Sequence, residues 1–222
     1  MVTRALDVVL LVPPGAGKGT QAKRLAAAFE LLHISTGDLL REEVAKGSGL
    51  GDEAKGYMNR GELVPDALVS KMLAKRLHSQ QAALGSVYDG YPRTTAQAVL
   101  LDGLLAELNR RVDAVLYLNV PDADIVARIT GRRSCTSCGA VFHVVTQPTK
   151  VESVCDSCGS AVLQREDDLE GVVVERIRVY REHTAPLLDY YRGRKIVREV
   201  DGAVGPDEVF KRLREAMGTV HA

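Results

Sequence analysis

A glycine-rich loop near the start of the chain carries a lysine and ends in a hydroxyl. The segment 12–20 reads VPPGAGKGT and follows the apolar run Val8–Leu11. In loops of this kind backbone N–H groups surround phosphate oxygens, the lysine reaches the β- and γ-phosphates, and the hydroxyl faces Mg²⁺. The helix expected over 20–30 points the positive end of its dipole at the same phosphates. The pattern predicts a nucleoside triphosphate site, with Mg²⁺, on Gly15, Ala16, Gly17, Lys18, Gly19 and Thr20.

The loop departs from the usual G-x-x-x-x-G-K-[ST] pattern at its first position. Val12 stands where that glycine is expected, whereas Gly15, Gly17 and Gly19 remain where the backbone must approach phosphate. We therefore expect a change in the shape of the loop entry and no change in its role. A strand-to-helix turn that binds nothing is the alternative, and the Gly-Lys-Gly-Thr run argues against it.

The four cysteines form two C-x-x-C pairs separated by 16 residues. This spacing is typical of a tetrahedral four-thiolate zinc site, in which iron can take the place of zinc. A disulfide is disfavoured in a reducing cytosol, and a redox C-x-x-C needs no second copy. Four thiolates leave no position open for water, so the site is expected to be structural. The expected metal ligands are Cys135, Cys138, Cys155 and Cys158.

The charge balance limits the partners of the chain. Over all 222 residues, 29 lysines and arginines balance 29 aspartates and glutamates, which favours neither nucleic acid nor an anionic membrane. The region 131–168 has four basic and five acidic residues, so a nucleic-acid-binding zinc ribbon is disfavoured. No apolar run approaches the roughly 20 residues that span a bilayer, and Asp7 interrupts the only signal-like stretch. We expect a soluble, cytoplasmic protein.

Further charged residues stand where phosphate chemistry would need them. Asp89 follows the predicted strand Ser86–Tyr88 and is placed to hold Mg²⁺ through water. Arg93 follows it and suits a phosphate with two parallel N–H donors. Phosphoryl transfer requires fixed cations, although a single arginine is more often part of a solvated helix face, and spacing does not show that these side chains meet. Four more arginines bracket 131–168, namely Arg128, Arg132, Arg165 and Arg176.

Apolar strands alternate with helical patterns along the chain. This alternation predicts a parallel sheet covered by helices on both faces. The region 131–168 interrupts the rhythm and resembles an insertion of small β-structure, after which one long helix over about 170–191 returns the chain. The expected strands are Val8–Leu11, Leu31–Ile34, Ser86–Tyr88, Ala114–Val120 and Ile196–Val200, and the other helices are 20–30, 38–46, 53–60, 66–78, 95–108 and 122–130.

Taken together, the motifs resemble adenylate kinases of the long-lid type with a zinc-bearing lid. The matching stretches occur in the family's order and cover essentially the whole chain. Tyr91 stands where phenylalanine is more usual in the family. The stretches are PGAGKGTQ from Pro14, ISTGD from Ile34, DGYPR from Asp89 with Gln97, GRR from Gly131, REDD from Arg165 and TAPL from Thr184.

The resemblance implies a fold and a reaction. The fold is an α/β P-loop core with a parallel five-stranded sheet (1–34, 65–126 and 166–222), a helical AMP-binding segment (35–64) and a small β lid (127–165). The reaction is reversible, Mg²⁺-dependent transfer between ATP and AMP, giving two ADP and maintaining adenine nucleotide balance. A monomer acting on these small molecules, without nucleic acid or membrane, is expected.

The resemblance also implies roles for individual residues. Gly15–Thr20 hold the ATP phosphates. Arg132, Val141 and Phe142 lie against ATP in the lid, and the backbone near Val204 borders the ATP adenine. The transferring group is stabilised by Lys18, Arg93, Arg128, Arg132, Arg165 and Arg176. The AMP site comprises Thr36, Arg41, Glu62, Leu63, Val64, Gly90, Tyr91, Pro92, Arg93 and Gln97, with Arg165 and Arg176 reaching the AMP phosphate.

Two other functions compete with this interpretation. A UMP or CMP kinase would share the chemistry, but by resemblance such enzymes carry an asparagine-containing segment after the arginine and a short lid, whereas this chain has Gln97 and a long insertion. A nucleotide-gated binding module with a zinc finger would need no second nucleotide pocket with Thr36, Arg41 and Gln97. Whether added AMP alters the rate of ATP turnover distinguishes a kinase from such a binding module.

Overall fold

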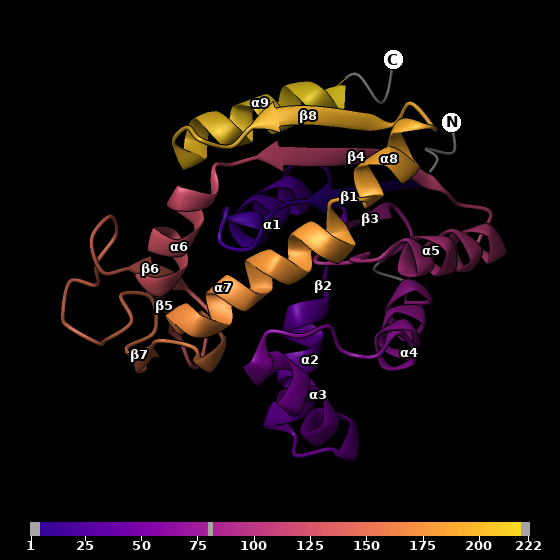
Figure 1. Ribbon diagram of the computed structural model, residues 1–222. Helices are drawn as coiled ribbons and strands as arrows, with labels where there is room; N and C mark the ends of the chain where they lie inside the picture. The colour runs from indigo at the N-terminus through magenta and orange to yellow at the C-terminus, as the bar shows by residue number, and fades with distance from the viewer. Residues whose placement is uncertain (1–4, 80–81, 219–222) are drawn as a thin grey trace.

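The computed structural model describes residues 5–79 and 82–218, and its centre is a parallel sheet of five strands in the order β2-β3-β1-β4-β8 (Figure 1). The expected core ends, 1–4 and 219–222, lie outside the described residues. Every neighbouring pair in this sheet is parallel, as the alternation of strands and helices predicts. The strands are β1 Leu6–Leu11, β2 Leu32–Ser35, β3 Gly85–Asp89, β4 Val112–Asn119 and β8 Val197–Asp201.

Helices cover both faces of this sheet. Successive side chains of a strand point to opposite faces, and in β1 apolar side chains are buried on both faces. Val8 and Leu10 of β1 join one buried cluster, which includes residues of α1, α6 and α9. Val9 and Leu11 join the other, which includes residues of α4, α5 and α8. The bounds are α1 Lys18–Ala28, α4 Asp66–Leu77, α5 Thr95–Glu107, α6 Asp122–Thr130, α8 Leu187–Arg192 and α9 Pro206–Gly218.

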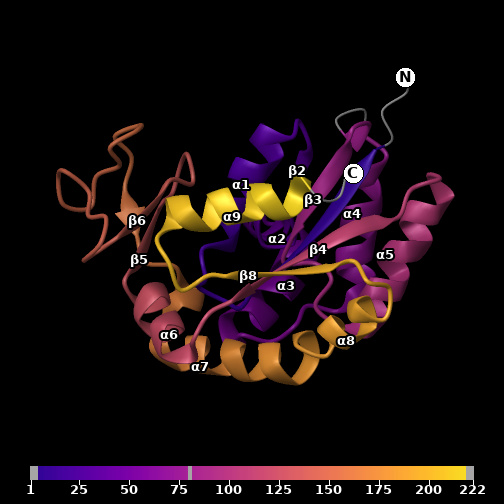
Figure 2. The same cartoon turned by 90° about the horizontal axis from the view of Figure 1, so that it is seen from above.

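Two smaller units project from this core. Helices α2 (Thr36–Ala45) and α3 (Gly49–Arg60) follow β2 and hang below the sheet in the view of Figure 1. A second sheet of order β6-β5-β7 lies at one end of α7 (Glu170–Val179), away from the parallel sheet in both views (Figures 1 and 2). Its strands are β5 Arg132–Cys135, β6 Val141–His143 and β7 Val162–Leu163. The region 131–168 is therefore an insertion of small antiparallel β-structure, as expected.

The expected long helix over 170–191 is interrupted. Helix α7 ends at Val179, a π-helical turn covers Tyr180–Thr184, and α8 starts after Pro186. Proline has no N–H to continue the helical hydrogen bonds, and the Ala185 N–H reaches back five residues to the Tyr180 carbonyl at 2.9 Å. The prediction of one continuous helix is wrong because it gave this proline no weight.

Helix α9 was not among the expected elements, although its signals are in the sequence. Proline stands at its first position and two acidic residues follow in the first turn, both favourable at a helix N-terminus. Val209, Leu213 and Met217 recur every fourth residue and are buried. In the part of the chain that the structure describes, no helix is long and apolar enough to cross a membrane.

A buried ion pair fastens β1 to the start of β4. The Asp7 side chain has no exposed surface and accepts hydrogen bonds from Tyr88 Oη at 2.7 Å and Arg110 Nε at 2.8 Å. Arg110 also donates through Nη1 to the Ala82 carbonyl at 3.0 Å. Removing one partner of such a pair leaves the other charge buried without compensation.

We expect Arg110→Met to lower the free energy of unfolding by about 3–5 kcal/mol, because it leaves the buried Asp7 carboxylate without its charge partner. Urea denaturation measures the change. Arg178→Met is the matched control, since Arg178 pairs with Glu175 and Glu182 on an exposed helix face, where ion pairs add little. Equal losses in the two variants would contradict the assignment of stability to the buried pair.

Candidate active site

A large, positively charged cleft opens where the glycine-rich loop, α2, the end of β3 and the small sheet face one another. Its volume is about 790 Å³. Nine of its lining side chains are lysine or arginine and five are aspartate or glutamate. A cleft of this size and sign suits an anionic ligand of nucleotide size or larger.

The glycine-rich loop adopts a backbone that only glycine accommodates easily. Gly15 and Gly17 have φ of 76° and 79°, and a Cβ on Gly15 would lie 2.2 Å from Cγ1 of Ile129. Helix α1 begins at Lys18 with Gly17 as its N-cap, which has no side chain to satisfy the N–H groups of the first turn. These N–H groups are therefore available to an anion. Val12, the residue that departs from the usual loop pattern, is buried in the same core cluster as Leu10. Its side chain therefore contributes to the core.

Lys18 lies in the cleft among other cations. Burial lowers the pKa of its ammonium group to about 8; Arg176, Arg93 and Arg132 act in the same direction, and Asp89 opposes them. The charged form is thus held at a cost that a bound anion would relieve.

Asp89 is a buried carboxylate at the end of β3. Its Oδ2 lies 3.3 Å from His33 Nε2, and a Cβ built on Gly19 would lie 3.5 Å from the same oxygen. Burial opposes ionisation, but the His33 hydrogen bond and the charge of Lys18 hold the pKa of Asp89 below its ordinary value. Its Oδ1 is buried without a hydrogen-bond partner among the described residues. An ionised oxygen beside the phosphate loop fits Mg²⁺, which takes oxygen ligands and retains water.

Arginines from three parts of the chain also meet at this cleft. Burial, together with Arg176, lowers the pKa of Arg93 to about 10. Burial, together with Arg41 and Arg132, lowers the pKa of Arg165 to about 10. Arg128 lines the cleft as well and lies 3.5 Å from the Gly202 carbonyl through Nη1. Spacing alone did not show that these arginines converge; the folded chain brings them together.

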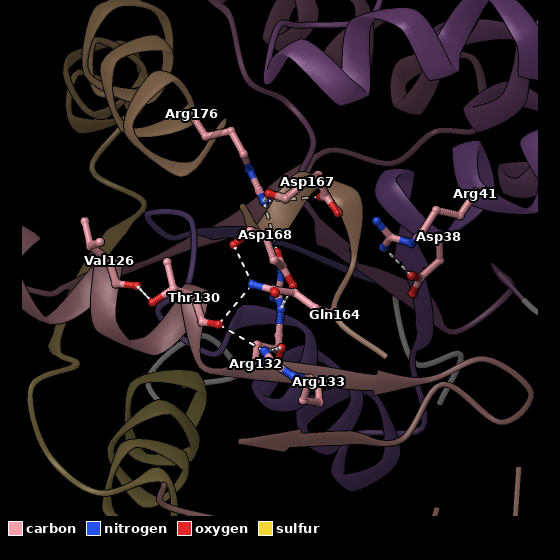
Figure 3. A network of polar contacts seen from close by, with 10 residues as sticks. All are labelled: Asp38, Arg41, Val126, Thr130, Arg132, Arg133, Gln164, Asp167, Asp168 and Arg176. Atoms are coloured by element: carbon pink, nitrogen blue, oxygen red, sulfur yellow. Dashed lines mark hydrogen bonds and ion pairs between the residues drawn. The ribbon is translucent and has the colours of Figure 1, made fainter. Parts of the chain in front are cut away.

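Asp168 and Asp167 bind two of the cleft arginines, Arg132 and Arg176 (Figure 3). The sequence patterns gave neither aspartate a role. The fully buried Asp168 pairs with Arg132, whose Nε donates to Oδ2 at 2.8 Å while Nη2 donates to Oδ1. Arg176 Nη1 donates to the Asp167 carbonyl at 2.7 Å and lies 3.2 Å from its Oδ2. The acidic run after Arg165 was the available signal. These pairs orient the two guanidinium groups in a cleft where positive side chains outnumber negative ones.

A second pocket of the cleft lies beside α2 and the start of α5. Thr36 Oγ1 donates to the Gly90 carbonyl at 2.9 Å, and Arg41 lies 2.5 Å from Asp38. The Gln97 amide is fixed at both ends, because its Oε1 accepts from the Arg93 N–H at 2.8 Å and its Nε2 donates to Asp66 at 2.6 Å. Other predicted residues that line the same cleft are Glu62, Leu63, Val64, Gly90 and Tyr91.

The remaining predicted nucleotide contacts divide into two groups. Val141 and Phe142 line the cleft from β6. Pro92 instead lines a smaller cavity of about 50 Å³ next to it, and Ala16 is buried in the core. Val204 packs against the core cluster and is not among the described residues that line the cleft.

The four cysteines converge in the small sheet unit. Their sulfur atoms all lie within 4.8 Å of one another, with 3.5 Å between Cys135 and Cys158 and 3.6 Å between Cys138 and Cys155. Gly139 and Gly159 follow the pairs with φ of 70° and 73°, as the two turns require. A tetrahedral zinc ion with bonds of about 2.3 Å would separate its sulfurs by about 3.8 Å. The donor set and spacing therefore fit a metal ion such as zinc.

Comparisons with known proteins agree on one family. The family model described as adenylate kinase matches residues 10–196. A protein named adenylate kinase from Archaeoglobus fulgidus is 49% identical over 208 residues, 94% of this chain and 96% of the relative. Those from Thermodesulfovibrio yellowstonii and Syntrophobacter fumaroxidans are 49% and 44% identical; the alignments cover 94% and 96% of this chain and 97% and 100% of those relatives.

We expect the affinity for ATP to fall as pH rises above about 8. Below this pH Lys18 is protonated before and after binding, so it contributes no pH dependence. Above it the free protein has lost the proton and binding must take one up, so the slope approaches tenfold per pH unit. Calorimetric titration in buffers of different ionisation enthalpy measures both affinity and proton uptake.

Two variants test whether Lys18 is the titrating group. Lys18→Arg should remove the break near pH 8, because the guanidinium stays protonated. Lys23→Arg alters another lysine that lines the cleft and should retain the break. A break that persists in Lys18→Arg would assign the titration to a different group.

Proposed function

The chain belongs to the adenylate kinase family, and from this premise we propose how its own residues perform the family reaction. The enzyme reversibly transfers the γ-phosphoryl group of ATP to AMP and gives two ADP. One observation carries the proposal for the site: a single cation-rich cleft connects the phosphate loop with the pocket around Gln97. A kinase that joins two nucleotides needs both ends in one cavity.

We assign the ATP phosphates to the loop Gly15–Thr20. Support comes from the left-handed glycines, the uncapped start of α1 and the depressed pKa of Lys18, each of which favours an anion there. We place the ATP base and ribose toward Arg132, Val141 and Phe142, which line the cleft from the small sheet. We place the backbone near Val204 beside the ATP adenine; its partly buried side chain packs against the core cluster.

We assign AMP to the pocket formed by Thr36, Arg41, Gly90, Tyr91 and Gln97. The side-chain amide of Gln97 is buried, and its two bonds to Arg93 and Asp66 fix the direction of its remaining donor and acceptor. Such an amide complements the edge of adenine, which offers both an acceptor and a donor. The segment 62–64 and Pro92 complete the proposed AMP site from the cleft and from the small cavity beside it.

The reaction proceeds by positioning and charge stabilisation. Lys18 and Arg93 line the cleft together with four arginines from within or near the inserted unit. These are Arg128 on α6, Arg132 on β5, Arg165 just before the 3₁₀ turn Glu166–Asp168, and Arg176 on α7. We propose that these cations stabilise the negative charge on the transferring phosphoryl group while the acceptor phosphate of AMP is held in line. The depressed pKa values of four of them fit groups that gain from a bound anion, namely Lys18, Arg93, Arg165 and Arg176.

We propose that Thr20, and Asp89 through water, hold the Mg²⁺ that accompanies ATP. When bound, Mg²⁺ neutralises charge on the β- and γ-phosphates. The unpartnered Oδ1 of Asp89 supports this assignment. His33 keeps the carboxylate oriented and ionised in the protein itself.

We also propose three functional parts. The core comprises 1–34, 65–126 and 166–222, the AMP-binding segment is 35–64, and 127–165 forms a lid whose four cysteines hold a structural zinc ion. A lid that closes on both substrates would exclude water, which competes with AMP for the phosphoryl group. Cysteines that hold a metal and form no disulfide suit a reducing compartment, so we propose that the protein acts in the cytoplasm. We also propose that it acts as a monomer.

We expect ADP formation from MgATP to be rapid with AMP and at least about 100-fold slower with UMP, CMP or GMP, because Gln97 complements adenine. A coupled assay with each acceptor in turn measures the rates. Gln97→Leu should raise the KM for AMP and leave the KM for ATP close to its original value. Preference for UMP or CMP would keep the mechanism and overturn the base assignment, and no transfer to any acceptor would overturn the function.

We expect one zinc ion per chain and a lid that loosens without it. Removal of the metal by a chelator, or the double substitution Cys135→Ser and Cys138→Ser, should speed amide hydrogen exchange in 131–164, because the small sheet has few apolar contacts of its own. Exchange in β1, β3 and β4 serves as the internal control and should be unchanged. Undiminished protection of 131–164 in the metal-free protein would contradict a structural role.

A further inference from the structure

One side-chain amide joins the two ends of the inserted unit. Gln164 lies one residue beyond β7, whose pairing with β5 ends at Ser134 and Leu163. Its Nε2 donates to the Thr130 carbonyl at 3.0 Å and to the Asp168 carbonyl at 3.2 Å (Figure 3). Thr130 is the last residue of α6, where the chain enters the unit, and Asp168 is the last residue of the 3₁₀ turn Glu166–Asp168, where the chain leaves it.

These two bonds frame the ion pair that orients Arg132. Arg132 lies two residues after Thr130, and its guanidinium binds both oxygens of the Asp168 carboxylate. Gln164 holds the main chain of the same Asp168, and Arg176 Nη1 approaches that carboxylate at 3.5 Å. Thr130, Arg132, Asp168 and Gln164 thus form a closed ring, in which the amide fixes the backbone on both sides of the ion pair.

The ring is secured on its α6 side as well. Thr130 Oγ1 donates to the Val126 carbonyl at 3.0 Å, and Arg133 Nη1 donates to the Thr130 carbonyl at 3.0 Å. The Thr130 carbonyl belongs to the last turn of α6, where carbonyl groups have no partner within the helix. Gln164 therefore donates to a carbonyl at the end of α6, just beyond the last backbone pairing of β5 with β7.

We propose that Gln164 is a positioning residue for phosphoryl transfer: its amide clamps the entry and exit of the lid so that Arg132, and through Asp168 also Arg176, are aimed at the transferring group. The inference rests on the proposed function of this cleft. A shift of about 1 Å in a group that stabilises a transition state can cost on the order of 100-fold in rate. The remainder of the unit is held by the β5 pairings and the cysteines, so it does not need this amide to fold.

The first test is Gln164→Met, which keeps the length of the side chain and removes its donors. We expect kcat to fall roughly tenfold or more, with little change in KM for AMP, one zinc ion per chain and an unchanged melting temperature. Thr136→Val is the matched control, because it removes a side-chain bond at the other end of the β5–β7 pair, from Thr136 Oγ1 to the Ala161 carbonyl at 3.2 Å. It should leave kcat within twofold.

A double-mutant cycle separates positioning from general support. Gln164→Met should lower kcat by a clearly smaller factor in an Arg132→Met background than in the original protein, because only the route through Asp168 to Arg176 then remains. The same fold-loss in both backgrounds, an unchanged kcat in the single variant, or an equal loss in Thr136→Val would overturn the proposal.

A readout without substrate keeps failure of this proposal distinct from failure of the proposed function. Exchange of the Arg132 Nε–H with water, followed by ¹⁵N NMR, should be slow in the original protein and clearly faster in Gln164→Met. Equal exchange in the two proteins would overturn the clamp even if the chain is an active kinase. Absence of ADP formation by the original protein, with exchange as expected, would overturn the function and leave the clamp standing.

Discussion

The site depends on one electrostatic constraint, which is the cost of holding several cations together in a cleft that partly excludes water. Burial and mutual repulsion lower the pKa of Lys18, Arg93, Arg165 and Arg176, and the nearby carboxylates compensate only part of this cost. Phosphate oxygens supply the missing negative charge. In the proposed mechanism binding energy and catalysis therefore have the same source, because the groups that gain most from an anion are those assigned to the transferring phosphoryl group.

The fold brings the charged groups of the cleft together from elements that are far apart in sequence. Lys18 stands at the start of α1 and Asp89 at the end of β3, which is the neighbour of β1 in the parallel sheet. Arg132 and Arg165 lie at the two ends of the small sheet unit, and Arg176 lies on α7. The buried pair of Asp7 and Arg110 holds the opposite end of the sheet and does not line the cleft. The buried ion pair of the core is thus separate from the charged groups that we propose for catalysis, and two of those arginines, Arg132 and Arg165, belong to the inserted unit.

Local patterns were enough to predict much of this arrangement. The five strands, the glycine-rich loop and the four-cysteine cluster each depend on short-range spacing, and the structure has all three near the expected positions. The interruption of the helix after Val179 depends on Pro186 and on a π-turn, which a periodicity of 3.6 residues does not register. The roles of Asp167, Asp168 and Gln164 depend on contacts between segments that only the folded chain brings together. The expectation for Val204 came from the resemblance alone; its partly buried side chain packs against the core cluster, which leaves that expectation a prediction.

The most direct test of the account is a crystal structure of the protein with MgADP in both nucleotide pockets. The account predicts that phosphate oxygens lie within hydrogen-bond distance of Lys18, Arg93, Arg132, Arg165 and Arg176, with Gln97 against one adenine. Phosphates bound at the loop alone, with these arginines contacting only Asp167, Asp168 or water, would contradict it.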